Sequence, residues 1–175
     1  TILFVDTRVN DYETLIAGLD SSIEIILLDQ QRDGLVQIAA ALLGRTGIDS
    51  IQILSHGSSG TLYLGSTTLT SSNLDQYTTE LAAIGSSLTN TGDVLLYGCN
   101  VAAGTEGQQF ITQLSELTGA DIAASTDITG SSTQGGDWVL EANTGSIETA
   151  SLNPTGWEGT LFPIYGDNND NVLYG

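Results

Sequence analysis

The sequence contains no lysine, no methionine and only three arginines among its 175 residues, whereas aspartate and glutamate together number 21. The resulting formal net charge of −18 repels nucleic acid and anionic membrane surfaces and favours divalent cations or basic partners. The missing lysine also removes the P-loop signature, and no GxGxxG motif occurs. The sequence therefore gives no support for nucleotide binding.

The single cysteine and the absence of long apolar runs bear on the compartment and on the class of protein. One cysteine cannot form an internal disulfide, so cysteine usage indicates neither an oxidising nor a reducing compartment. No stretch of 18 apolar residues and no basic region followed by an apolar one occurs, so neither a membrane-spanning helix nor a secretory signal peptide is predicted. Export would then depend on a signal outside this chain. Apolar residues make up 40% of the chain, which is typical of a globular domain with one core.

Apolar runs that predict buried strands alternate with segments of helical periodicity along most of the chain. The predicted strands cover residues 2–6, 23–29, 50–56, 93–98 and 121–125, and the predicted helices cover residues 11–19, 33–45, 73–88 and 104–119. Residues 61–70 alternate like a small hairpin, and residues 137–149 resemble a closing hairpin. This order favours an α/β domain with a mainly parallel sheet flanked by helices.

His56 and Cys99, the only histidine and the only cysteine, each follow an apolar run that reads as a strand. Catalytic groups gather beyond the carboxyl ends of parallel strands, and two strands joined by one helical crossover usually lie side by side. We therefore expect the two side chains to face each other as a nucleophile and its proton partner. The alternative is that Cys99 is a small core residue and that His56 binds a backbone carbonyl.

The stretches LSHGSSGTLYLG (54–65) and LLYGCNVAAG (95–104) resemble the His-Gly and Cys signatures of the caspase-like clan of cysteine peptidases. Residues 2 to about 160 also resemble an uncharacterised bacterial domain found near the start of very long cyanobacterial and proteobacterial surface or secreted proteins. The resemblance implies a caspase–hemoglobinase fold, with His56 as the general acid and Cys99 as the nucleophile. It also implies that the backbone N–H groups of Gly57 and Cys99 bind the oxyanion.

The side chain that selects the substrate is left open by these motifs. Arg8, just past the first strand, would favour an acidic or amide residue before the cleaved bond, whereas Asp6 or Asp127 would favour arginine or lysine. The plain alternative for Arg8 is an ion pair with a surface carboxylate. Cys99 lies just ahead of the helix predicted to begin near Gly104, and the dipole of that helix is expected to lower the pKa of the thiol.

The C-terminal stretch YGDNNDNVLYG (165–175) departs from the α/β pattern. It resembles the first unit of the calcium-binding nonapeptide repeats of type I secreted proteins, with Asp170 in the aspartate position. The resemblance divides the chain into an α/β domain over residues 1–160 and a linker with the start of a repeat over residues 161–175. It also implies Ca²⁺ as a structural or activating ion, although no cofactor is required for the chemistry. A flexible acidic linker is the alternative, because Asp and Asn favour turns without any metal.

Two functions follow from these observations. The first is a cysteine endopeptidase that cleaves its own polypeptide, calcium-dependently, within a large secreted or cell-surface protein. Residues 152–164 are rich in Pro, Gly and Thr and suit an extended segment that enters a groove. The second is a non-catalytic N-terminal module that folds or binds, with Cys99 as part of its core.

Overall fold

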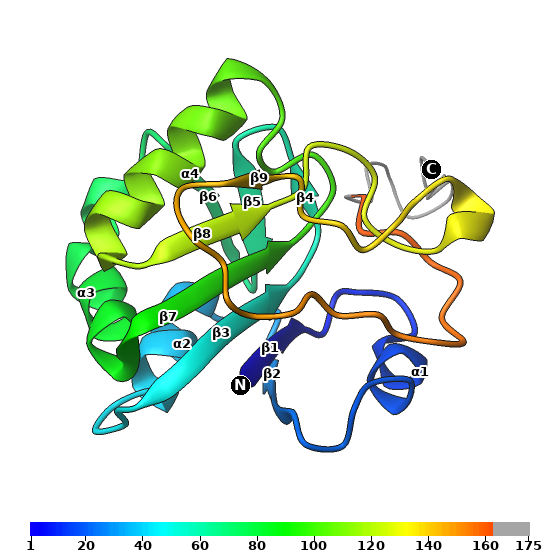
Figure 1. The fold of residues 1–175 in the computed structure, drawn as a ribbon, viewed down its shortest axis with the longest axis horizontal. Helices are drawn as coiled ribbons and strands as arrows, with labels where there is room; N and C mark the ends of the chain where they lie inside the picture. The colour runs from blue at the N-terminus through cyan, green and yellow to red at the C-terminus, as the bar shows by residue number, and fades with distance from the viewer. Residues whose placement is uncertain (163–175) are drawn as a thin grey trace.

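A computed structural model describes residues 1–162 and contains a six-stranded sheet in the order β2-β1-β3-β7-β8-β9 (Figure 1). Its first five strands run parallel, and only the short β9 runs antiparallel to its neighbour. The predicted α/β class with a mainly parallel sheet is confirmed. The strands are β1 (Ile2–Asp6), β2 (Glu24–Leu28), β3 (Ile48–Leu54), β7 (Leu88–Tyr97), β8 (Asp121–Ala124) and β9 (Ala142–Asn143).

The helices form where the sequence combines helical periodicity with terminal signals. Asp33 caps α2, because its carboxylate accepts hydrogen bonds from the first backbone N–H groups of that helix. Gly119 ends α4 with a φ of 75°, a left-handed conformation that favours glycine. The helices are α1 (Tyr12–Ala17), α2 (Gly34–Ala41), α3 (Thr78–Ser87) and α4 (Gly104–Thr118), with the short 3-10 helices η1 (Leu74–Tyr77) and η2 (Ser132–Gln134).

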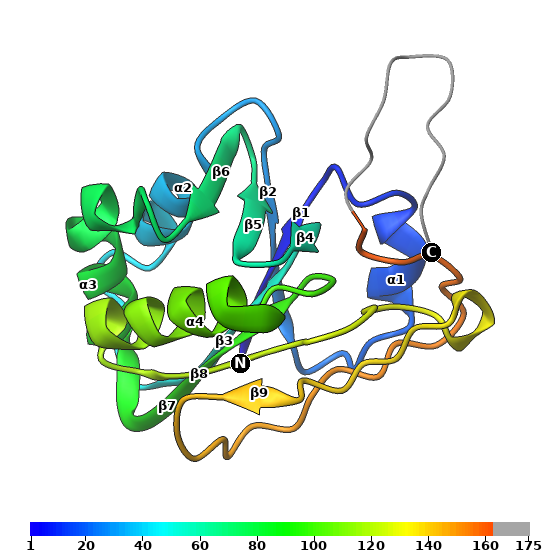
Figure 2. The same ribbon diagram turned by 90° about the horizontal axis from the view of Figure 1, so that it is seen from above.

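The two faces of the sheet bury separate hydrophobic clusters. Helices α2, α3 and α4 cover one face, together with apolar residues of a small antiparallel sheet formed by β4 (Gly57–Ser58), β5 (Thr61–Leu64) and β6 (Thr67–Thr70). The other face is covered by α1 and by the chain after β8, which crosses the sheet as an irregular segment (Figures 1 and 2). Both faces are therefore buried, as the continuous apolar strands predict.

The C-terminal third differs from its predicted form. Residues 137–149 do not form a hairpin of their own, because β9 pairs with β8 instead. Leu152, Trp157 and Leu161 are buried in the second cluster, so the stretch up to residue 161 belongs to the domain and is not a free linker. Asp170 and the predicted calcium repeat lie outside the described residues. Of the described helices, none is both long and apolar enough to cross a membrane.

Candidate active site

The strand order creates a topological switch point between β1 and β3. From β1 the chain passes to the edge strand β2 and then returns across the sheet to β3, so the helices that follow the two neighbouring strands leave on opposite faces. Ligands bind at such points, beyond the carboxyl ends of the strands. A cavity of about 660 Å³ lies here. It is lined by the loop Thr7–Glu13 and by Gln30, His56, Tyr63 and Thr68.

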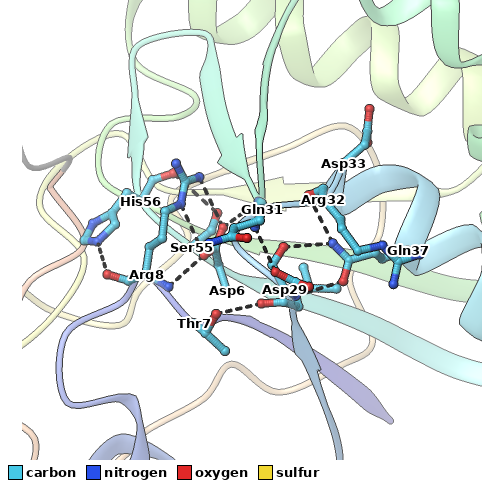
Figure 3. A network of polar contacts seen from close by, with 12 residues as sticks. Asp6, Thr7, Arg8, Asp29, Gln31, Arg32, Asp33, Gln37, Ser55 and His56 are labelled. Atoms are coloured by element: carbon cyan, nitrogen blue, oxygen red, sulfur yellow. Dashed lines mark hydrogen bonds and ion pairs between the residues drawn. The ribbon is translucent and has the colours of Figure 1, made fainter.

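His56 is fixed in this position by a hydrogen bond from its ring. Nε2 lies 3.3 Å from the carbonyl oxygen of Arg8 (Figure 3). Because a carbonyl can only accept, Nε2 carries the proton and Nδ1 of the neutral ring keeps a lone pair. Nδ1 is buried and has no hydrogen-bond partner among residues 1–162. Burial lowers the pKa of His56, against the opposing effects of the Arg8 and Leu161 carbonyls, so the ring is neutral near pH 7.

Cys99 follows β7, and His56 follows the neighbouring strand β3. Strands β3 and β7 are parallel neighbours in which Leu54 is paired with Tyr97. His56 and Cys99 each lie two residues beyond these partners, at the ends of neighbouring strands. Cys99, Leu54 and Tyr97 belong to the same hydrophobic cluster. The crossover rule thus predicted the relation of the two strands correctly.

The thiol of Cys99 is in its neutral form. Its Sγ accepts a hydrogen bond from the Thr129 N–H at 3.3 Å and donates to the Thr129 carbonyl at 3.5 Å. The side chain is fully buried, and burial is the main reason that its pKa is raised from 9.0 to about 11. The nearby Asp127 charge acts in the same direction. The expectation of a thiol pKa lowered by α4 is therefore wrong, because desolvation outweighs the dipole of a helix that begins five residues later.

The backbone N–H of Gly57, a predicted oxyanion donor, is hydrogen-bonded to a carbonyl of the same chain. The acceptor is the oxygen of Leu161, at 3.1 Å. A side chain at this position would not fit, since a Cβ on Gly57 would lie 2.5 Å from the Val101 side chain and 3.2 Å from the Cys99 carbonyl. Glycine is therefore needed here for close packing between the two strand ends.

The three predicted specificity residues do not lie together. Arg8 lines the cavity, but its guanidinium pairs with Asp6 at 3.3 Å (Figure 3). Asp6 is buried and also accepts a hydrogen bond from the Gly65 N–H at 2.7 Å, so its carboxylate holds the β5–β6 turn against β1 and does not line the cavity. The alternative expectation for Arg8, an ion pair with a carboxylate, agrees with this contact, except that the carboxylate of Asp6 is buried and not on the surface.

Asp127 lies after β8 in a cluster of exposed carboxylates. Oxygen atoms of Asp127, Asp137 and Glu141 come within 4.8 Å of one another, an arrangement of hard ligands that suits a divalent cation. The side chain of Asp127 accepts a hydrogen bond from the Ser125 hydroxyl at 3.1 Å. Asp127 lies close enough to Cys99 for its charge to raise the pKa of the thiol.

Two residues that sequence reasoning did not single out complete the arrangement. Thr129 supplies the backbone groups around Sγ, and Leu161 supplies the carbonyl on Gly57. No residue type marked them, because backbone N–H and C=O groups are common to every residue and only the fold selects which ones face the site.

Comparison with known proteins gives one match. Neither a curated protein nor a solved structure matches this sequence. The model of a family described as "Domain of unknown function (DUF4347)" matches residues 2–161, which is nearly all of the described chain. This chain therefore belongs to the DUF4347 family.

Proposed function

We propose that this domain is a cysteine endopeptidase of the caspase-like type that acts on its own polypeptide. The observation that carries the proposal is the state of His56, which follows β3, the strand paired with the β7 strand that precedes Cys99. Its Nε2 is committed to the Arg8 carbonyl, and its buried Nδ1 has no partner within the described chain. An unpaired buried nitrogen costs free energy that ordinary packing would avoid. A role in proton transfer to and from the neighbouring thiol accounts for it.

The neutral thiol and the neutral imidazole define how the dyad would work. As the Sγ of Cys99 attacks a peptide carbonyl, its proton passes to Nδ1 of His56, which is the unprotonated nitrogen. The Gly57 N–H stabilises the oxyanion. The imidazolium then protonates the leaving amine, and water hydrolyses the resulting thioester to release the acid and restore the thiol. The hydrogen bond to Arg8 keeps the ring in the tautomer that this sequence of steps requires.

A second candidate, a non-catalytic folding or binding module, is favoured by one observation. Cys99 has no exposed surface and its pKa is raised to about 11, which are properties of a structural cysteine. The two candidates differ in what covers the thiol: a permanent core in one, and a displaceable or cleavable segment in the other.

The test is cleavage by the purified chain and by three variants. Wild type, Cys99→Ala, His56→Ala and His56→Gln are incubated with and without calcium and followed by intact mass spectrometry. Glutamine can still donate to the Arg8 carbonyl but offers no base, so His56→Gln is the matched control for structure. We expect fragments from wild type only.

Cleavage between molecules is tested by mixing wild type with a tagged Cys99→Ala chain. The same fragments formed at an unchanged rate by Cys99→Ala alone refute the assignment of the nucleophile. If wild type stays intact and leaves the tagged chain intact with and without calcium, the non-catalytic module is correct.

A further inference from the structure

The segment Trp157–Leu161, called the docked segment below, lies extended along the loop that follows β8. Thr160 forms an antiparallel bridge with Gly130. On either side of it, the Ser131 N–H donates to the Gly159 carbonyl at 2.9 Å and the Leu161 N–H donates to the Thr129 carbonyl at 2.9 Å. This is the pattern by which proteins bind extended peptides, with main-chain hydrogen bonds for affinity and side-chain pockets for specificity.

The last residue of the docked segment brings its peptide groups to the dyad. The Leu161 carbonyl accepts from the Gly57 N–H at 3.1 Å and lies close enough to His56 to raise its pKa. The Leu161 N–H lies close enough to Sγ of Cys99 to lower the thiol pKa, and both groups share the Thr129 carbonyl. The carbonyl of Leu161 therefore occupies the place where an oxyanion would be stabilised.

The side chain of Leu161 fills an apolar pocket beside Cys99. It has no exposed surface and packs within the cluster that contains Val5, Leu54, Tyr97 and Cys99. Four residues earlier, Trp157 anchors the segment, because its indole N–H donates to the Asn10 carbonyl at 3.0 Å and the residue is buried. Both ends of the docked segment are thus held, and the pocket at its end fits an uncharged aliphatic side chain.

We infer that the docked segment is the substrate of this domain and that the bond cleaved is the peptide bond between Leu161 and Phe162. The inference rests on the proposed function and adds the site and the specificity, an apolar residue before the cleaved bond. It differs from the expected charged pocket, since Arg8 and Asp6 pair with each other.

The reaction follows from the contacts. Sγ of Cys99 bonds to the Leu161 carbonyl carbon while its proton moves to His56, and the Gly57 N–H holds the negative oxygen. The C–N bond to Phe162 then breaks, and the Phe162 nitrogen takes the proton from His56 and leaves as an amine. One water hydrolyses the Leu161 thioester, which leaves a Leu161 carboxylate and the Cys99 thiol. Because enzyme and substrate are one chain, tethering gives an effective concentration of roughly millimolar without further affinity.

The primary test maps the new amino terminus in the 175-residue chain. We expect wild type to yield a fragment ending at Leu161 and a peptide beginning at Phe162, and Cys99→Ala to yield neither. Leu161→Met conserves volume and should be cleaved within about threefold of the wild-type rate. Leu161→Asp places a charge in the apolar pocket and should be cleaved at least about tenfold more slowly. Phe162→Ala changes the residue after the bond and should leave the cleavage position unchanged.

A second probe decides the matter if Leu161→Asp does not fold. The peptide chloromethyl ketone Glu-Gly-Thr-Leu, which carries the sequence of residues 158–161, should alkylate Cys99 of the wild-type chain with loss of chloride. The matched Glu-Gly-Thr-Asp reagent should react at least about tenfold more slowly, for the same reason of charge burial. Labelling is read by intact mass.

The outcomes distinguish failure of this inference from failure of the proposed endopeptidase function. Cys99-dependent cleavage at another bond overturns the inference and leaves the endopeptidase in place. A chain that cleaves neither itself nor the tagged chain, with and without calcium, overturns both, whether or not a reagent labels it. Equal labelling by the two reagents overturns the apolar specificity.

Discussion

Replacing Ser131 by proline should release the docked segment from the Cys99 thiol without disturbing the core. Ser131 has a φ of −65°, which is the value that proline imposes, so the ring fits the local backbone. The substitution removes the N–H that donates to the Gly159 carbonyl at 2.9 Å. Ser131→Ala keeps this N–H and loses the same hydroxyl, which bonds locally to Thr133. The pair of variants therefore isolates one hydrogen bond.

The size of the effect follows from the energy of that bond. A neutral backbone hydrogen bond contributes about 0.5–1.5 kcal/mol, so its loss should raise the population of the open segment about two- to twelvefold. Cys99 is covered in the closed state, and alkylation then proceeds through the open one. In the closed state the rise of the thiol pKa from 9.0 to about 11 would reduce the reactive thiolate about a hundredfold at pH 8.

The assay is the rate of iodoacetamide modification of Cys99, followed by intact mass. A His56→Gln background prevents turnover during the measurement, and the chain unfolded in urea gives the unprotected rate. Ser131→Pro should react about two- to twelvefold faster than Ser131→Ala. Equal rates in the two variants would show that this bond does not hold the segment over the thiol, and the docked geometry would be refuted.

Three further predictions concern the same site. Gly57→Ala should abolish cleavage and lower the melting temperature, because its Cβ would lie 2.5 Å from the Val101 side chain; unchanged cleavage would contradict the oxyanion assignment. Burial lowers the pKa of His56 below 6.5, so the unfolded chain binds a proton before the folded chain does as the pH falls. The free energy of unfolding therefore decreases as the pH drops below 6.5. Urea titrations should show that His56→Gln loses less stability than wild type between pH 7 and 5. The Cys99 pKa rises from 9.0 to about 11, so the unfolded chain loses its proton first. Wild type should therefore lose about 2 kcal/mol more stability than Cys99→Ala between pH 9 and 11.

Much of the framework could be predicted from local sequence. The strands are apolar runs and the helices carry a 3.6-residue periodicity. Both patterns show which side chains of an element are buried, and they can be read from residues that are close in sequence. The chirality and adjacency of crossovers predict that His56 and Cys99 follow neighbouring parallel strands, as the pairing of β3 with β7 confirms. The closing hairpin was predicted wrongly because alternation over residues 137–149 is short, and pairing with β8 decided its form.

By itself, then, the sequence determined the α/β class, the parallel order around the site and the placement of its single histidine and its single cysteine after neighbouring strands, because these depend on periodicity and on short connections. Only the tertiary structure decided which backbone groups surround Cys99, that the buried Asp6 carboxylate accepts from the Gly65 N–H, and that the Leu161 carbonyl accepts from the Gly57 N–H. The pKa of Cys99 was decided there too, because desolvation sums over all surrounding atoms. These contacts join residues that are 30 or more positions apart in the sequence, so they arise from packing and no local pattern encodes them.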